Sequence, residues 1–127
     1  MLKKIESKNA PKAIGPYSQA ILANGFVFVS GQLPIDPKTG ELAEGTIVEQ
    51  TIVVLDNLQA ILKEAGSGLA NCVKVEVFLA NLDDFALFNE VYAKKLVGEP
   101  RPARFVVQAA GLPKNALLEV SVTAILP

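Results

Sequence analysis

One segment organises the chain: residues 46–65, with the sequence TIVEQTIVVLDNLQAILKEA. Thr46 followed by Glu49 is a capping box, in which a hydroxyl and a carboxylate satisfy backbone donors at the start of a helix. Apolar residues then recur at helical spacing, and Gly66 supplies the stop. The segment therefore predicts an amphipathic helix whose apolar face covers a sheet.

Strand-like runs surround this helix. Asn24-Gly25 lies between two apolar runs, and this dipeptide is a strong signal for a tight hairpin turn. A second helix is expected to begin at Asn81 and to close before Gly98. These elements predict an α+β fold, with a mixed sheet of about six strands and two helices on one of its faces. The expected strands are residues 19–23, 26–30, 73–79, 103–109 and 117–126, with a surface turn at 36–40.

The last predicted strand has two unlike faces. Leu118, Val120 and Val122 point one way and fit a helix-covered core, whereas Glu119 and Ser121 point the other way among apolar neighbours. Two helices cannot cover both faces of a six-stranded sheet. The uncovered, half-apolar face therefore predicts a homo-oligomer built by sheet-to-sheet packing.

Length and composition exclude several classes of protein. The 127 residues fit one domain, 1–127, and the absence of histidine removes Ser-His-Asp catalysis, Cys-His catalysis and HExxH zinc sites. The single cysteine, Cys72, cannot form an intramolecular disulfide or a cysteine-rich metal site, and it is interpreted as a small buried hydrophobe. A net charge of −1 gives no general attraction to nucleic acid. Without a signal core or a long apolar run, the chain is expected in the cytoplasm, with no membrane partner.

Arg104 and Glu119 are the most informative charged residues. The chain has only two arginines, Arg101 and Arg104, and both lie in the segment PRPAR at 100–104. Glu119 is the one acid in an apolar strand. Because burying an unpaired charge is costly, its carboxylate is expected either to pair with a cation or to serve a function. Two interpretations stay open: a structural ion pair that joins strands, or a site in which Arg104 binds a small carboxylate while Glu119 positions water.

Two further segments are weaker candidates. Gly15 and Pro16 stiffen the backbone before Tyr17, so they either present the tyrosine to a site or leave it half-buried as packing. Gly31, after Ser30, either ends a strand or lines a site.

Five segments, taken in order, form a recognisable set: AP at 10–11 with IGPYSQA at 14–20, VSGQLP at 29–34, LDDF at 82–85 with Asn89 and Tyr92, PAR at 102–104, and LP at 112–113 with LEV at 118–120. In these segments the chain resembles the RidA/YjgF family over essentially its whole length. The resemblance implies a chorismate-mutase-like fold and a homotrimer with sites in the clefts between subunits. It also implies a cytosolic enamine/imine deaminase, which hydrolyses 2-iminobutanoate and 2-iminopropanoate to 2-oxo acids and ammonia.

The resemblance also implies roles for single residues. Arg104 matches the arginine that grips the substrate carboxylate, and Glu119 matches the acid that orients the hydrolytic water. Arg104 and Glu119 of one subunit are expected to converge on the substrate, with the neighbouring subunit closing the pocket. No cofactor or metal is expected, because an imine carbon is already electrophilic. The remaining positions that match the family pocket are Tyr17, Ser30, Gly31 and Asn89.

Three positions depart from the family pattern. Val106 stands where some members have a cysteine, and Ser121 replaces a common acid. Phe105 follows the arginine where many members carry a smaller residue, and it either packs on the far face of its strand or lines the cleft.

Two other functions stay open: a non-catalytic module that binds 2-oxo acids in the same pocket, and a ribonuclease or translation inhibitor. The missing histidine and the scarcity of arginine weigh against the last.

Overall fold

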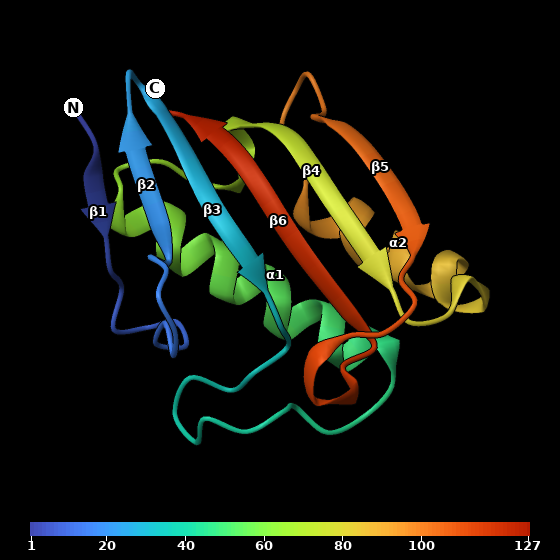
Figure 1. Ribbon diagram of the computed structural model, residues 1–127. Helices are drawn as coiled ribbons and strands as arrows, with labels where there is room; N and C mark the ends of the chain where they lie inside the picture. The colour runs from blue at the N-terminus through green and yellow to red at the C-terminus, as the bar shows by residue number, and fades with distance from the viewer.

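The computed structural model describes all 127 residues and has two layers, a six-stranded sheet and two helices that lie against one of its faces (Figure 1). The strand order is β1-β2-β3-β6-β4-β5, and every neighbouring pair is antiparallel except β4 and β5, which are parallel. The predicted mixed sheet with both helices on one face is confirmed. The strands are β1 (Lys3–Ile5), β2 (Ala20–Ala23), β3 (Phe26–Gln32), β4 (Cys72–Leu79), β5 (Ala103–Gln108) and β6 (Leu118–Ile125).

The hairpin of β2 and β3 turns at the expected dipeptide. Asn24 and Gly25 both have positive φ, 54° and 81°, the left-handed backbone that a two-residue hairpin turn requires. The strand β3 extends past Ser30 to Gln32, so Gly31 does not end it. Between Val29 and Gln32 the register against β6 shifts, which marks a bulge in β3.

The helix α1 (Ile47–Glu64) forms where the sequence predicts it. The backbone N–H of Thr46 donates to Glu49 Oε1 at 2.6 Å, and the N–H of Val48 donates to Thr46 Oγ1 at 3.3 Å, which confirms the capping box. The apolar face of α1 packs on the centre of the sheet, where β3 and β6 lie side by side (Figure 1). Side chains that are fully buried there include Val54, Leu58, Val27 and Val120.

Replacing the N-cap tests how much this helix start stabilises the fold. The Thr46→Ala variant loses the acceptor for a backbone donor, and we expect the free energy of unfolding to fall by about 1 kcal/mol. The Thr46→Ser variant keeps the hydroxyl and is expected to unfold at the same urea concentration as the wild type. Equal unfolding midpoints for Thr46→Ala and the wild type would contradict the stabilising role of this cap.

The second helix begins in two steps. A short 3-10 turn (Leu82–Asp84) precedes α2 (Phe85–Lys95), and Asn81 Oδ1 accepts a hydrogen bond from the N–H of Asp83 at 2.8 Å. The helix α2 packs beside α1 on the same face of the sheet (Figure 1). Neither helix is both long and apolar enough to cross a membrane.

The opposite face of the sheet has no helical cover. Large apolar side chains on this outer face are 36–48% exposed, which leaves an unpartnered apolar surface, as the alternation of β6 predicts. They are Phe26 and Phe28 of β3, Phe105 and Val107 of β5, and Ile125 of β6.

Candidate active site

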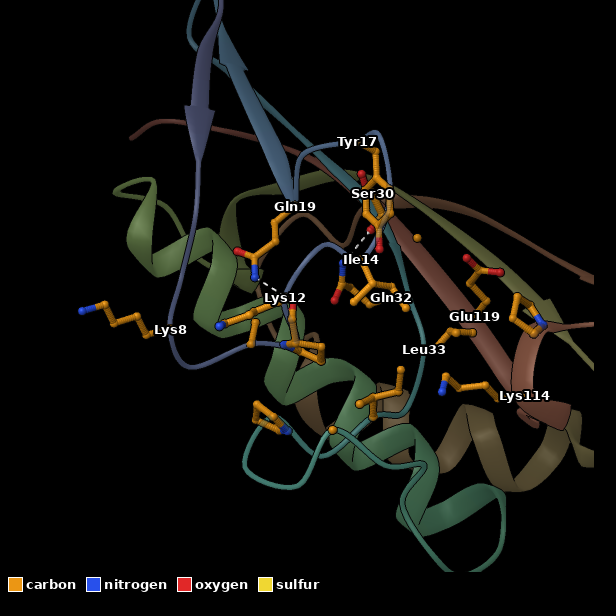
Figure 2. Close-up of a pocket in the computed structure, with 17 residues that line it drawn as sticks. Lys8, Lys12, Ile14, Tyr17, Gln19, Ser30, Gln32, Leu33, Lys114 and Glu119 are labelled. Atoms are coloured by element: carbon orange, nitrogen blue, oxygen red, sulfur yellow. Dashed lines mark hydrogen bonds between the residues drawn. The ribbon is translucent and has the colours of Figure 1, made fainter.

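A cleft of about 1010 Å³ opens where the segment before β2 approaches the end of β3 and the start of β6. Four of the predicted site residues line it, and Figure 2 labels three of them, Tyr17, Ser30 and Glu119, with Glu119 projecting from β6. Lys114, from the turn before β6, also lines this cleft. The four predicted residues are Tyr17, Ser30, Gly31 and Glu119.

A buried glutamine holds one wall of the cleft. The side chain of Gln19 accepts a hydrogen bond from the N–H of Ser7 at 2.6 Å and donates to the carbonyl oxygens of Ser7 and Pro11, at 3.2 and 2.7 Å. These bonds fix a segment that has no regular structure of its own. Sequence reasoning missed this role; the available signal was a polar residue at the core-facing start of a strand.

Backbone hydrogen bonds hold Tyr17 at the cleft and occupy the hydroxyl proton of Ser30. The N–H of Tyr17 donates to the carbonyl oxygen of Gly15 at 2.8 Å, and the side chain is 49% exposed at the cleft rather than packed inside. The Ser30 hydroxyl donates to the carbonyl oxygen of Ser18 at 2.6 Å. Because its proton is committed there, Ser30 Oγ can serve a ligand in the cleft only as an acceptor.

Gly31 makes room for Glu119. A Cβ atom at position 31 would overlap Oε2 of Glu119, closer than such contacts occur, and would lie only 3.0 Å from its Cδ. The absence of a side chain at Gly31 therefore lets the Glu119 carboxylate lie over β3, at the bulge where the register shifts.

The Glu119 carboxylate is half-buried without a charged partner. The two salt bridges of the chain join Lys4 to Glu6 and Lys95 to Asp56, so the structural Arg104–Glu119 ion pair that the sequence left open is not formed. Burial raises the pKa of Glu119 above its ordinary value. A partly desolvated carboxylate of this kind is more basic than a surface glutamate, which suits a group that accepts a proton from water.

Arg104 belongs to a second cluster, outside the cleft. Its Nη1 donates to Asn89 Oδ1 at 2.7 Å, and its Cζ lies 4.6 Å from the centroid of the Tyr92 ring. Asn89 and Tyr92 are both on α2, so the guanidinium lies on the helix-covered side of the sheet. The structure thus joins two predicted residues, Arg104 and Asn89, and separates them from the other four.

The expectation that Arg104 and Glu119 of one subunit converge is wrong. In the sheet, Arg104 of β5 pairs with Val75 of β4, whose side chain is buried under the helices. Glu119 of β6 pairs with Phe78 of β4, which directly follows the buried Val77 in the chain. Neighbouring residues of a strand point to opposite faces. The two side chains therefore lie on opposite faces of the sheet, and one small substrate cannot contact both in a single chain.

Phe105, which departs from the family pattern, lies on the outer face. Its ring meets Phe78 edge to face with centroids 5.7 Å apart, and Lys74 Nζ lies 5.7 Å from its centroid. Of the two alternatives for Phe105, the structure shows packing on the strand face opposite Arg104. On the same outer face, the Ser121 hydroxyl donates to Glu76 Oε1 at 2.9 Å.

Cys72 matches its structural interpretation. Its thiol is buried, and burial raises the pKa of Cys72 to about 12, so the thiolate is not accessible near neutral pH. No cluster of three or more His, Cys, Asp or Glu side chains is arranged to hold a metal ion.

Comparison with known proteins agrees with this architecture. The family model described as Endoribonuclease L-PSP matches residues 7–126. A RutC family protein of Pyrococcus horikoshii is 52% identical over 124 residues, covering 98% of each chain. The crystal structure of the Rid family protein YyfA from Yersinia pestis superposes with a TM-score of 0.96 at 46% identity, over 98% of this chain and 99% of that one. Escherichia coli TdcF, crystallised with bound serine, gives a TM-score of 0.90 at 40% identity, over 97% and 98% of the two chains.

These matches cover nearly the whole of this chain and of each related chain, and the sequence identities of 40–52% are high enough to assign the family. The resemblance seen in five separate segments of the sequence is thereby confirmed. The chain belongs to the family described as Endoribonuclease L-PSP, the RidA/YjgF family.

Proposed function

We propose that this protein is an enamine/imine deaminase that hydrolyses 2-iminobutanoate and 2-iminopropanoate to 2-oxo acids and ammonia. The observation that carries the proposal is the Glu119 carboxylate, half-buried, unpaired and raised in pKa, which lies over Gly31 in a cleft with Tyr17 and Ser30. A carboxylate of this kind can hold and deprotonate water. The relative TdcF binds serine, a small molecule with a carboxylate, which is the chemical group that Arg104 suits.

The reaction needs only what these residues provide. Water held by Glu119 adds to the imine carbon: its oxygen forms the new C–O bond, the C=N π electrons move to nitrogen, and one proton passes to Glu119. The carboxylate then returns that proton to the nitrogen. Glu119 then takes the proton of the new hydroxyl and passes it to the amino nitrogen. The O–H electron pair forms the C=O bond of the 2-oxo acid, the C–N bond breaks with its electron pair going to nitrogen, and ammonia leaves. Ser30 Oγ, whose own proton is committed to Ser18, accepts a hydrogen bond from the imine N–H.

The site is completed between copies of the chain. Arg104 and Glu119 lie on opposite faces of the sheet, so the substrate carboxylate and the substrate imine carbon must be served by different copies. The two half-sites are unlike, so the contact that joins them is head-to-tail, and such contacts form a closed ring when the rotation between copies closes. The exposed apolar outer face supplies a surface for this packing. We propose a homotrimer, in which Arg104 and Asn89 of one copy face the cleft of the next.

Two measurements test this function. Purified protein is expected to accelerate the loss of 2-iminobutanoate that a dehydratase generates in situ, and to run as a trimer in light scattering coupled to size-exclusion chromatography. A protein with no effect on imine decay would refute the deaminase. A monomer with full activity would refute a site shared between copies.

The Gly31→Ala variant tests the space over which Glu119 lies. The added methyl displaces the carboxylate, so we expect kcat to fall by about 10- to 100-fold, as for a misplaced catalytic group. Gly111→Ala is the matched control, since a Cβ there meets no atom within 4 Å and is expected to leave kcat unchanged. Steady-state kinetics on both variants, with circular dichroism to confirm folding, measures whether the space over Gly31 matters for kcat. Equal kcat in Gly31→Ala and the wild type would show that Glu119 does not act from this position.

Ribonuclease activity is the second candidate, because the matched family model carries that description. The chain has no histidine and a net charge of −1, which gives it neither the usual acid–base pair for RNA cleavage nor an overall positive charge that attracts RNA. RNA cleavage that survives repurification and disappears in Glu119→Gln would favour this candidate. Tight binding of 2-oxobutanoate with no turnover of imines would instead indicate a non-catalytic binding module.

A further inference from the structure

We propose that Tyr92 is a positioning residue for Arg104: its ring supports the guanidinium from beneath and holds it in the plane that binds the substrate carboxylate. The inference rests on the proposed function, in which Arg104 binds that carboxylate. It gives a role to a buried side chain that, like Arg104, does not line the cleft.

The support comes from one face of α2. Arg104 Cζ lies 4.6 Å from the Tyr92 ring centroid and 5.8 Å from that of Phe85, while Nη1 donates to Asn89 at 2.7 Å. Phe85, Asn89 and Tyr92 are spaced at i, i+4 and i+7, so they share one side of the helix. The helix thus presents two aromatic rings and an amide oxygen to a single guanidinium.

The Tyr92 ring is itself fixed by the core. Tyr92 is 5% exposed, and its ring centroid lies 5.6 Å from that of Phe88, which is fully buried. Arg104, in contrast, is half-buried. A rigid, buried ring beneath a less buried guanidinium restricts the rotamers of a long and otherwise flexible side chain.

This arrangement leaves the guanidinium free to bind. A guanidinium stacked on an aromatic ring uses its face, whereas its N–H donors point outward in its plane. Asn89 takes one of the five donors. The remaining donors can meet a carboxylate as a fork, which is the strong, bidentate geometry for this pair.

The phenol group of Tyr92 reports the proximity of Arg104. Burial raises the pKa of Tyr92, and the Arg104 charge acts against that rise. Cys72 adds to the increase and Arg101 opposes it, both with smaller effect. The chain has two tyrosines and no tryptophan, so in a Tyr17→Phe background the near-ultraviolet absorbance of tyrosinate comes from Tyr92 alone.

The first experiment measures binding of 2-oxobutanoate by calorimetry. We expect Tyr92→Leu, which removes the ring, to weaken binding about tenfold and to raise KM by a similar factor with kcat changed by less than about threefold. Tyr92→Phe keeps the ring and is expected to restore binding to within about twofold. Val54→Ala, a core truncation on α1, controls for lost stability and is expected to leave binding unchanged.

The second experiment needs neither substrate nor turnover. In the Tyr17→Phe background, Arg104→Gln is expected to shift the tyrosinate titration to higher pH, because the neighbouring positive charge is gone. Circular dichroism across the titration confirms that the fold persists.

The outcomes separate the inference from the proposed function. A tenfold loss in Tyr92→Leu, recovery in Tyr92→Phe and a shifted titration support the inference. Unchanged binding in Tyr92→Leu, or an unshifted titration in Arg104→Gln, overturns it. A shifted titration in a protein that binds no 2-oxo acid and turns over no imine supports the Tyr92–Arg104 contact and overturns the proposed function.

Discussion

Replacing Arg104 with alanine is expected to lower kcat/KM for 2-iminobutanoate by about 1,000-fold, because a desolvated charge pair lost from a binding site costs about 4 kcal/mol. Most of the loss is expected in KM, since the arginine holds the carboxylate in both the ground state and the transition state. Arg104→Lys keeps the charge without the planar fork, and we expect it to recover only part of the loss.

The other arginine of the chain supplies the matched control. Arg101 Nη1 donates to the carbonyl oxygen of Leu96 and contacts neither Asn89 nor the cleft. The Arg101→Ala variant is therefore expected to keep kcat/KM within about threefold of the wild type, the range of ordinary surface substitutions. Equal losses in the Arg101 and Arg104 variants would contradict a specific role for Arg104.

Replacing Glu119 with glutamine is expected to lower kcat by about 1,000-fold, the size of a general-base contribution. KM is expected to change little, because Arg104 and not Glu119 holds the substrate carboxylate. The control is Glu90→Gln, which neutralises an exposed carboxylate on α2. If Glu119→Gln raised KM and left kcat intact, Glu119 would be a binding group rather than the base.

The pH dependence of kcat and kcat/KM also tests the role of Glu119 as the base. Glu119 must be deprotonated to accept a proton, and burial raises its pKa, so activity falls as pH decreases through a value above the ordinary glutamate range. In the proposed trimer without substrate, Arg104 of the adjacent copy is expected to lower that pKa in part. In the substrate complex, the substrate carboxylate neutralises the guanidinium. The acidic limb is therefore expected at higher pH in kcat than in kcat/KM, and the reverse order would contradict the shared site.

Local sequence signals predicted most of the fold. The capping box at Thr46, the Asn24-Gly25 turn and the alternation of β6 each act within a few residues, and the structure confirms all three. The strand β1 carries no such signal. Its residues Lys3–Ile5 form a strand because β2 offers an edge to pair with, which is a tertiary effect.

The separation of Arg104 from Glu119 could not be predicted in the same way. The β5 sequence ARFVVQ has apolar residues on both faces, Phe105 and Val107 outside and Val106 inside, so its hydrophobic pattern does not say which face Arg104 takes. The pairing of β5 with β4 decides it. Likewise, the fit of Glu119 over Gly31 depends on a bulge that shows only in the pairing of β3 with β6.

In the proposed trimer each site takes Arg104 from one copy and Glu119 from another, and mixing two inactive variants tests this sharing of residues. Arg104→Ala and Glu119→Gln, each nearly inactive alone, would be unfolded together, refolded as mixed trimers and assayed with 2-iminobutanoate. Random assembly pairs an intact arginine with an intact glutamate at about a quarter of the sites, one half for each partner. We therefore expect the mixture to recover about a quarter of wild-type activity. Activity that stays at the sum of the two separate variants would contradict it, because it would mean that both residues act from the same chain.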